Sequence, residues 1–339
     1  MEGGRYGKIR LYFGLGGLGF ILTVLLIPYF IRWMRRAHLG QHIREYGPKI
    51  HEYKRGTPTM GGAVVLLVFV VLIVGSYTAG VSLKSVLVLF ATLGYGAIGL
   101  VDDLLSLSRG RSLGLGVRQK FVLQIAVAAL FFLGLRLDLF LSRPVLVPFV
   151  DVELVLSPYL YLGLVILVLL STTNGMNLTD GLDGLAAGTS IIILSVYAMF
   201  VYLQGEIDLL GPIIVMVSIL LGFLWFNFHP AQVFLGDTGS FALGGFVGAL
   251  AILTGTELLL LVVGGVLVVE TLSVIVQVMS YKLFGKRVFK VSPLHHHFER
   301  AEGVDYPYLL PNFEWSESQI VVRFWILGMA FGLIAIFAY

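Results

Sequence analysis

The chain has 339 residues, of which 58% are hydrophobic and 13% are charged, and its formal net charge is +3. This composition is too apolar for an ordinary soluble protein of the same length. Apolar runs of about 20 residues, the length that an α-helix needs to cross the hydrocarbon core of a bilayer, recur along the whole chain. The sequence has no cysteine, which excludes disulfides, a thiol nucleophile and thiolate metal ligands.

The apolar runs predict an all-α polytopic membrane protein with about ten spanning helices, organised as one domain over residues 1–339. Barrel strands would instead appear as short alternating segments, which do not dominate here. The alternating Val and Leu around Pro144 and Pro148 predict a small β-hairpin between residues 137 and 157. The expected spans are 11–32, 60–79, 83–101, 119–136, 158–173, 184–203, 211–229, 239–255, 257–284 and 318–338.

The distribution of positive charge predicts the orientation. Ten spans place both termini on one side of the membrane. On the other side, the connections 32–59, 102–120 and 282–317 hold sixteen of the 23 Lys and Arg residues. The loops on the side of the termini hold only Lys84, Arg136 and Arg143. By the positive-inside rule the crowded side is cytoplasmic, so the termini and the hairpin are expected to be extracytoplasmic.

Five aspartates fall where the predicted spans meet the cytoplasmic side: Asp102, Asp103, Asp180, Asp183 and Asp237. A carboxylate at the bilayer centre costs roughly 2.5–3.5 kcal/mol. These side chains must therefore face water, a cation, or both. Carboxylates without thiolates favour a hard, oxygen-seeking cation, which predicts a membrane enzyme with an acidic Mg²⁺ site at one bilayer face.

Asp102 and Asp103 are expected to end the third span. Adjacent helical residues diverge by about 100°, so the two carboxylates should have different roles. One would face a cation, and the other a substrate proton or a cationic side chain. The alternative is a pair of solvated helix-end charges, although acidic residues at a helix C-terminus oppose the macrodipole.

Polar side chains recur at every third position of the segment 174–184. On an ideal helix this series would drift by about 60° per step and wind around half of the helix. Gly175, Gly181 and Gly184 instead favour an irregular loop in which the polar groups converge, or a polar loop with helix caps. The polar residues of this series are Asn174, Asn177, Asp180 and Asp183.

The segment 227–240 combines an acidic turn with aromatic residues. Asp237, Thr238 or Ser240 could be the N-cap of the eighth span. The amide and aromatic side chains upstream offer hydrogen-bonding edges and flat faces suited to a planar base, although aromatics are common at membrane interfaces. These upstream residues are Asn227, Phe228, His229 and Phe234.

Two further segments favour phosphate. Ser292 and Pro293 are predicted to be the N-cap and first residue of a short helix, whose N-terminus would attract an anion beside the run His295, His296 and His297. A zinc site is the alternative, but consecutive histidines point in different directions. The segment 54–62 contains two cations, Lys54 and Arg55, two hydroxyls, Thr57 and Thr59, and glycine amides that suit a diphosphate. Its alternative is a basic anchor before a helix that starts at a proline.

Glu270 lies well inside the predicted ninth span, and Gln277 follows two turns later. A carboxylate within a membrane is a functional candidate by default. A structural buried hydrogen bond is an equal alternative, and the sequence assigns Glu270 no role.

Together these segments predict phosphoryl transfer. An acidic site holds an anionic diphosphate only when a metal ion and cationic side chains offset the repulsion. Positioning and charge neutralisation are what phosphoryl transfer requires. The membrane setting suggests that one substrate is a lipid phosphate.

Seven motifs follow one another along the chain: KRGTPTMGG at 54–62, VDD at 101–103, NLTDGLDGL at 177–185, FNFHPAQVFLGDTGS at 226–240, ETLSVIVQV at 270–278, PLHHHFE at 293–299 and VVRFW at 321–325. Over essentially the whole chain they resemble the phospho-N-acetylmuramoyl-pentapeptide transferases, which are polyprenyl-phosphate N-acetylhexosamine-1-phosphate transferases. The acidic motifs mark the wider superfamily. The TPTMGG segment and the triple-histidine loop point to the muramoyl-pentapeptide branch.

The resemblance implies a Mg²⁺-dependent reaction of UDP-N-acetylmuramoyl-pentapeptide with undecaprenyl phosphate. The products would be lipid I and UMP, in peptidoglycan biosynthesis. It implies a multi-pass protein of the bacterial cytoplasmic membrane, with its active site facing the cytoplasm and with no nucleic-acid partner. Homodimers occur in the family, and the sequence neither requires nor excludes one.

The resemblance also implies roles for individual residues. Asp237 would bind Mg²⁺, with Asp102 and Asp103 at the reaction centre and as further candidate ligands. Phe234 would stack on uracil, and Asp183 and Asn227 would read the nucleoside. Lys120, His295 and His296 would handle phosphate and sugar. The candidate catalytic residues are Asp102, Asp103, Lys120, Asp237 and His295. The candidate substrate-binding residues are Lys54, Thr57, Thr59, Asn174, Asn177, Asp180, Asp183, Asn227, Phe234, His296 and His297.

Two alternatives to this function stay open. A relative that uses N-acetylglucosamine would keep the chemistry and change the sugar. A cation-coupled transporter would instead place polar residues near the bilayer midplane. One departure from the family is the loop between Glu299 and Trp315, which is about ten residues longer than expected and could alter contacts with the peptide stem.

Overall fold

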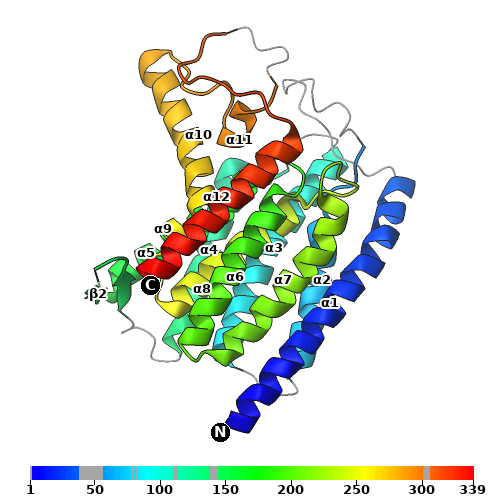
Figure 1. Cartoon of the computed structure of the whole chain (residues 1–339), viewed down its shortest axis with the longest axis vertical. Coiled ribbons are helices and arrows are strands. Elements are labelled where there is room, and N and C mark those ends of the chain that lie inside the picture. Colours follow the sequence, from blue (N-terminus) through cyan, green and yellow to red (C-terminus); the bar gives the residue numbers. More distant parts are fainter. Residues whose placement is uncertain are drawn as a thin grey trace.

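The computed structural model describes residues 2–37, 56–77, 80, 82–109, 114–137, 144–150, 152–300 and 306–339. Within these residues the protein is a bundle of long helices with one small hairpin (Figure 1). The helices are α1 (Glu2–Arg36), α2 (Gly61–Ser76), α3 (Leu83–Arg109), α4 (Val117–Arg136), α5 (Pro158–Thr179), α6 (Leu185–Leu203), α7 (Ile207–Asn227), α8 (Gly236–Thr254), α9 (Leu260–Val263), α10 (Gly265–Phe284), α11 (Leu294–His297) and α12 (Glu317–Ala338).

The helices confirm the predicted membrane architecture. In the described part of the chain, 9 helices are long and apolar enough to cross a bilayer. The predicted second span is shorter, because α2 has only 16 residues and a length of about 24 Å. The predicted ninth span is broken at Gly264 into α9 and α10. Among the described residues, the nine long helices and the shorter apolar helix α2 together account for the predicted number of about ten.

The predicted hairpin is confirmed. Strands β1 (Val145–Val147) and β2 (Val152–Leu154) pair antiparallel, with Leu146 opposite Glu153. The Leu146 N–H donates to the carbonyl of Gly255, 3.1 Å away, which ties the hairpin to the turn after α8.

Helix α8 is the centre of the bundle, and every residue from Thr238 to Thr254 is buried. Helices α2, α3 and α5 pack on it at very close range, because glycines line the contacts. A Cβ on Gly62 would overlap the backbone of Gly239, and a Cβ on Gly99 would overlap the carbonyl of Asp237. Such close backbone approach is the usual role of small residues between membrane helices.

Two predicted boundaries were wrong, and both corrections affect the acidic residues. Helix α3 continues to Arg109, so Asp102 and Asp103 are not at its end. Helix α5 continues to Thr179, which makes Asn174 and Asn177 helical and limits the irregular segment to 180–184. The buried threonines do not interrupt α5, because their hydroxyls donate to carbonyls one turn back, as Thr179 does to Gly175 at 2.8 Å.

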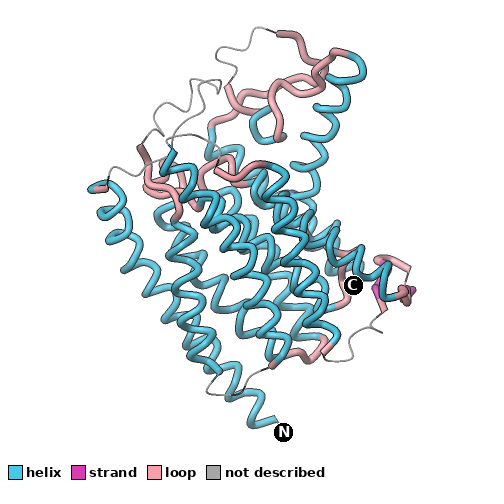
Figure 2. The backbone as a smooth tube through the Cα atoms, turned by 180° about the vertical axis from the view of Figure 1, so that it is seen from behind, coloured by secondary structure: helices cyan, strands magenta, loops and turns pink. Residues whose placement is uncertain are grey.

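The loops near the acidic residues gather at one end of the bundle. Figures 1 and 2 show that α10 rises past this end and that α11 lies beside it. Helix α11 starts at Leu294 with Pro293 as its N-cap, one residue later than predicted. Both chain ends lie away from this part of the molecule (Figure 1).

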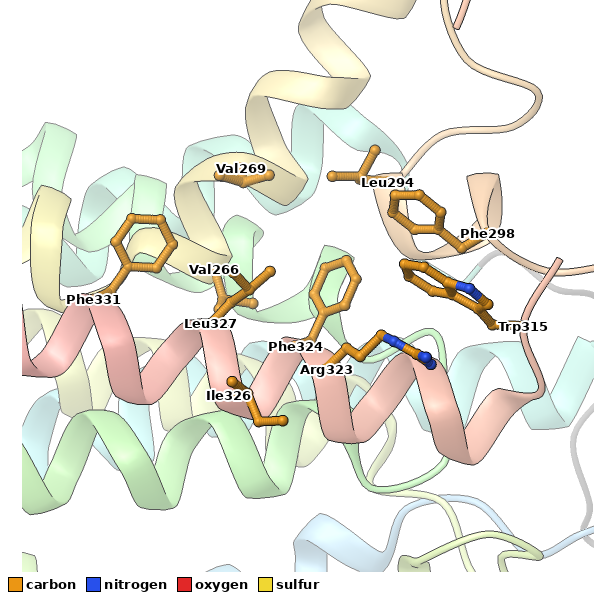
Figure 3. A pocket seen from close by; sticks show the side chains of 10 residues that line it. All are labelled: Val266, Val269, Leu294, Phe298, Trp315, Arg323, Phe324, Ile326, Leu327 and Phe331. Atoms are coloured by element: carbon orange, nitrogen blue, oxygen red, sulfur yellow. The ribbon is translucent and has the colours of Figure 1, made fainter. Parts of the chain in front are cut away.

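An apolar pocket of about 370 Å³ lies between α10, α11 and α12. Figure 3 shows Phe298, Trp315 and Phe324 around it, with Arg323 as the charged residue of its lining. The Arg323 guanidinium lies 4.2 Å from the centroid of the Trp315 ring. Among the described residues no carboxylate lines this pocket, so it suits an apolar occupant and is separate from the acidic site described below.

The close α3–α8 contact predicts a specific sensitivity. Replacing Gly99 with Ala should destabilise the protein by about 1–3 kcal/mol, because the new methyl group would force α3 away from Asp237. Thermal unfolding in detergent measures this. Gly163→Ala in α5 is the matched control, because no atom lies within 4 Å of its Cβ position. An equal response of the two variants would contradict the close-packing argument.

Candidate active site

A lysine joins two of the predicted acids. Lys120, in the first turn of α4, places its Nζ 3.0 Å from Asp102 Oδ2 and 2.8 Å from Asp237 Oδ2. Asp102 comes from α3 and Asp237 from the first turn of α8, so the cluster unites three helices. One ammonium group lies between two carboxylates, which leaves the three groups with a net negative charge when all are ionised.

Asp103 has different hydrogen-bond partners from Asp102. Its Oδ2 accepts from the Thr238 amide at 2.9 Å and from the Thr238 hydroxyl at 2.6 Å, and its Oδ1 accepts from the Asp237 amide at 3.2 Å. A carboxylate at a helix N-terminus satisfies free N–H groups and interacts favourably with the helix dipole. Asp103 thus anchors the start of α8, whereas Asp102 faces the cationic side chain. The adjacent carboxylates do point to different partners.

Two residues from the end of α5 complete the cluster. The Asn177 amide donates to Asp237 Oδ1 at 2.8 Å and to Ser240 Oγ at 3.0 Å. Asp180 follows the helix directly, and burial, followed by the charges of Asp237, Asp103 and Asp183, raises its pKa well above 3.8. Thr59 borders the same place, because a Cβ on Gly236 would lie 3.1 Å from the Thr59 hydroxyl and 2.8 Å from Asp103 Oδ2.

The donor groups of this cluster fit a hard divalent cation. Asp102 and Asp237 offer carboxylate oxygens, which Mg²⁺ prefers over nitrogen or sulfur. A single cationic side chain already lies between these oxygens, so the position attracts positive charge. A divalent ion would balance the negative charge that Lys120 leaves.

A second acidic group lies nearby. Ligand atoms of Asp183, His229 and Glu317 all lie within 4.8 Å of one another, a spacing that could hold a metal ion. However, His229 Nδ1 is 3.1 Å from Asp183 Oδ2 and 3.5 Å from Glu317 Oε2, so the imidazole already links the two acids. Because it includes an imidazole nitrogen, this group suits Mg²⁺ less well than the carboxylates near Lys120.

Two of the predicted nucleoside-binding residues, Asp183 and Asn227, meet at the turn 180–184. Asp183 Oδ2 accepts from the Ala231 amide at 3.0 Å, and Asn227 Oδ1 accepts from the Gly184 amide at 3.1 Å. The Phe234 amide donates to the Pro58 carbonyl at 2.8 Å, which ties its loop to the segment before α2. Three loops that are distant in the sequence therefore meet beside the acidic cluster.

Sequence reasoning missed Glu317. Its Oε1 accepts from the Asp183 amide at 2.7 Å, so the first residue of α12 holds the turn 180–184. The only local signal is its place just before an apolar run, where acids are common as helix-start residues. That signal does not reveal its distant partner.

The three histidines have separate partners among the described residues. The amide of His295 donates to Glu270 Oε1 at 3.2 Å. This N–H of α11, which was predicted to attract phosphate, is therefore bound to a carboxylate of the protein. His296 Nδ1 lies 2.7 Å from Glu299 Oε2. His297 accepts from the Lys290 amide at 3.0 Å, and burial lowers its pKa. The rings therefore do not share one zinc position.

The remaining predicted residues lie elsewhere or outside the described chain. Asn174 donates to Gln124 Oε1 at 2.9 Å and to the Leu170 carbonyl at 2.8 Å, which joins α5 to α4 one turn away from Asn177. Thr57 is partly buried beside the segment that binds Phe234. Lys54 falls outside the described residues.

The described part of the long loop packs against the segment after α10. The Leu309 amide donates to the Arg287 carbonyl at 3.0 Å, and the Tyr306 hydroxyl donates to the Lys290 carbonyl at 2.9 Å. The Arg287 guanidinium lies 4.1 Å from the centroid of the Tyr306 ring. The described part of this loop therefore packs against residues 287–290, which lead into α11.

The charge of Asp180 predicts a pH effect on stability. When folding raises the pKa of a carboxyl group, the free energy of unfolding falls over a range of pH. That range extends from the pKa of the group in the unfolded chain, near 3.8, to its raised pKa in the folded protein. Asp180→Asn should remove this loss, which cannot exceed about 1.4 kcal/mol per pH unit. Unfolding in detergent with a chelator, across a pH series, measures the difference. Asp208→Asn is the control, because it removes a carboxylate that pairs with Lys8 on the surface, away from the cluster. If the free energy of unfolding changed with pH in the same way in wild type and in Asp180→Asn, the prediction would be refuted.

Comparison with known proteins identifies the family. The model of glycosyl transferase family 4 matches residues 85–255, which carry Asp102, Asp103, Asp180, Asp183 and Asp237. A phospho-N-acetylmuramoyl-pentapeptide-transferase of Geobacillus kaustophilus is 46% identical over 322 residues, which cover 94% of this chain and 95% of the relative.

Other relatives carry the same name. The Halalkalibacterium halodurans protein is 45% identical and the Bacillus subtilis protein is 43% identical, each over 94% of this chain and 95% of its own length. The similarity thus extends over the acidic cluster and the histidine loop alike. The chain is a transferase that belongs to glycosyl transferase family 4, in the branch of the phospho-N-acetylmuramoyl-pentapeptide transferases.

Proposed function

We propose that this membrane transferase moves phospho-N-acetylmuramoyl-pentapeptide from its UDP derivative to undecaprenyl phosphate, giving lipid I and UMP, with Mg²⁺ as cofactor. Family membership supports the substrates, since the relatives are named for this transfer. The observation that carries the proposal is the cluster in which Lys120 contacts Asp102 and Asp237. Such a mixed-charge site can hold phosphate groups and offset their repulsion.

The reaction exchanges one phosphoanhydride linkage for another and leaves the ester between the sugar and its phosphate intact. An oxygen of the lipid phosphate attacks the sugar-bound phosphorus of the nucleotide, and the bond to the UMP phosphate breaks. Asp102 accepts from the Leu115 amide at 2.6 Å through Oδ1, and its Oδ2 faces the Lys120 ammonium. It is the better candidate to orient the lipid phosphate or remove its proton, because both oxygens of Asp103 are engaged by hydrogen bonds to the start of α8. Lys120 neutralises charge on the reacting phosphates. Mg²⁺ held by Asp237 would act as an electrostatic clamp on the diphosphate.

The nucleotide would lie over the turn 180–184. Phe234 provides an aromatic face for uracil, and Asp183 and Asn227 provide polar groups in the same region. Thr59 and Asn177 border the phosphates. His295 and His296, on α11, would approach the sugar beside the same turn.

The site would face the cytoplasm across the bacterial inner membrane. The loops at the acidic end of the bundle carry most of the Lys and Arg residues, which the positive-inside rule assigns to the cytoplasm. A nucleotide substrate is made in that compartment. The apolar pocket beneath α11 gives a lipid substrate a low-polarity surface close to the histidines.

The metal role predicts a large loss of activity. Asp237→Ala should lower Mg²⁺-dependent release of UMP by roughly 10³-fold, since it removes both a metal ligand and a partner of Lys120. The assay uses purified protein in detergent with UDP-N-acetylmuramoyl-pentapeptide and undecaprenyl phosphate, with Mg²⁺ or with a chelator. Asp208→Asn, whose carboxylate pairs with Lys8 outside the cluster, should keep its activity. Full activity of Asp237→Ala would reject the metal role.

The sugar specificity is tested by offering two donors. We expect turnover with the UDP-N-acetylmuramoyl-pentapeptide and little with UDP-N-acetylglucosamine. The opposite preference would move the protein to the N-acetylglucosamine branch. UMP release by purified protein in detergent, where there are no compartments, would close the transporter alternative.

A further inference from the structure

Glu270 is a buried carboxylate that the chemistry above does not use. It lies on α10 in a segment apolar enough to cross a membrane, and its side chain is 0% exposed. A buried ionised group without compensation costs several kcal/mol, so its surroundings should show a specific partner. That partner is His295, 25 positions later in the chain.

Two contacts join these residues. Glu270 Oε1 accepts the His295 amide at 3.2 Å, and Glu270 Oε2 lies 3.1 Å from His295 Nδ1. The histidine is also 0% exposed. Neither Oε2 nor Nδ1 makes a hydrogen bond among the described residues, so the amide bond is the one hydrogen bond that joins the pair, and the 3.1 Å contact brings the carboxylate beside the ring. A carboxylate beside one ring nitrogen can orient an imidazole, as in metal-binding and catalytic histidines.

The second ring nitrogen lies against the turn 180–184, over which the nucleotide is proposed to bind. Nε2 of His295 is buried and has no hydrogen-bond partner among the described residues. It lies directly against the turn 180–184, because a Cβ on Gly181 would overlap it. Buried polar atoms are almost always satisfied, so an unpaired nitrogen beside a site suggests a ligand as its partner.

We propose that Glu270 is a positioning residue, which holds His295 so that Nε2 meets a polar group of the sugar phosphate in the bound nucleotide. This inference rests on the proposed function and deepens it. Gly181 is part of the same arrangement, since only a residue without a side chain leaves room for the ring. Glu270 thereby connects α10 to the turn that carries Asp180 and Asp183.

The test measures kcat and KM for UMP release in a double-mutant cycle. Glu270→Gln keeps an oxygen for the His295 amide but loses the charge beside Nδ1, so we expect the protein to fold and kcat/KM to fall about 10–100-fold. In a His295→Ala background the same substitution should change kcat/KM less than about twofold, because a residue that acts through His295 has nothing left to position. An equal loss in both backgrounds would overturn the inference.

A second pair of variants tests the contact from the other side. Gly181→Ala should lower kcat/KM when His295 is present, because the methyl group displaces the ring, and should have little further effect with His295→Ala. Ser273→Ala is the matched control on α10, since its hydroxyl donates only to the Glu270 carbonyl at 2.7 Å and should not affect turnover. A loss of activity in Gly181→Ala that persists without His295 would contradict the arrangement.

The outcomes separate this inference from the proposed function. A wild-type protein that releases no UMP from UDP-N-acetylmuramoyl-pentapeptide would overturn both. An active wild type with unchanged Glu270→Gln would overturn the role of Glu270 alone. Rescue of kcat/KM by Glu270→Asp relative to Glu270→Ala would support positioning by a carboxylate.

Discussion

The site depends on the anchoring of the α8 N-terminus by Asp103. This buried carboxylate accepts the amides of Asp237 and Thr238 together with the Thr238 hydroxyl. Hydrogen bonds to a charged group contribute about 1.5–3 kcal/mol each when both partners are in place. The glycines that face α8 make this possible, because they let α3 approach until the side chain of Asp103 reaches the free amides. The position of Asp237 therefore follows from backbone contacts between two helices.

Charge balance explains the rest of the cluster. Asp102, Asp180 and Asp237 lie close together near the membrane, where uncompensated carboxylates are costly. Lys120 offsets part of this charge, and burial, followed by the charges of Asp237, Asp103 and Asp183, raises the pKa of Asp180. A site with excess negative charge attracts a divalent cation, and with the cation in place it can accept a diphosphate. The excess negative charge would thus favour binding of the cation and, with the cation, of the diphosphate substrate.

The loops at the acidic end of the bundle add a second layer of organisation. Glu317 holds the turn 180–184 from α12, and the Glu270–His295 pair reaches the same turn from α10. These contacts connect the helix after the break at Gly264 and the last helix to the residues that would bind the nucleotide. A movement of α10 or α12 would therefore also move the turn 180–184. The long loop before α12 packs on the segment after α10 and supports the same side of the site.

The sequence by itself determined the membrane architecture, the acidic chemistry and the family, because these depend on local hydropathy, residue type and contiguous motifs. It also placed Asp102, Asp103, Asp180, Asp183 and Asp237 at one end of the bundle. Only the tertiary structure decided that Asp103 anchors α8 whereas Asp102 meets Lys120, and that Asn174 faces α4. It alone revealed Glu317 and the pairing of Glu270 with His295. These partners are between 18 and more than 130 positions apart in the chain, and no local pattern encodes which distant atoms will be close when the helices pack.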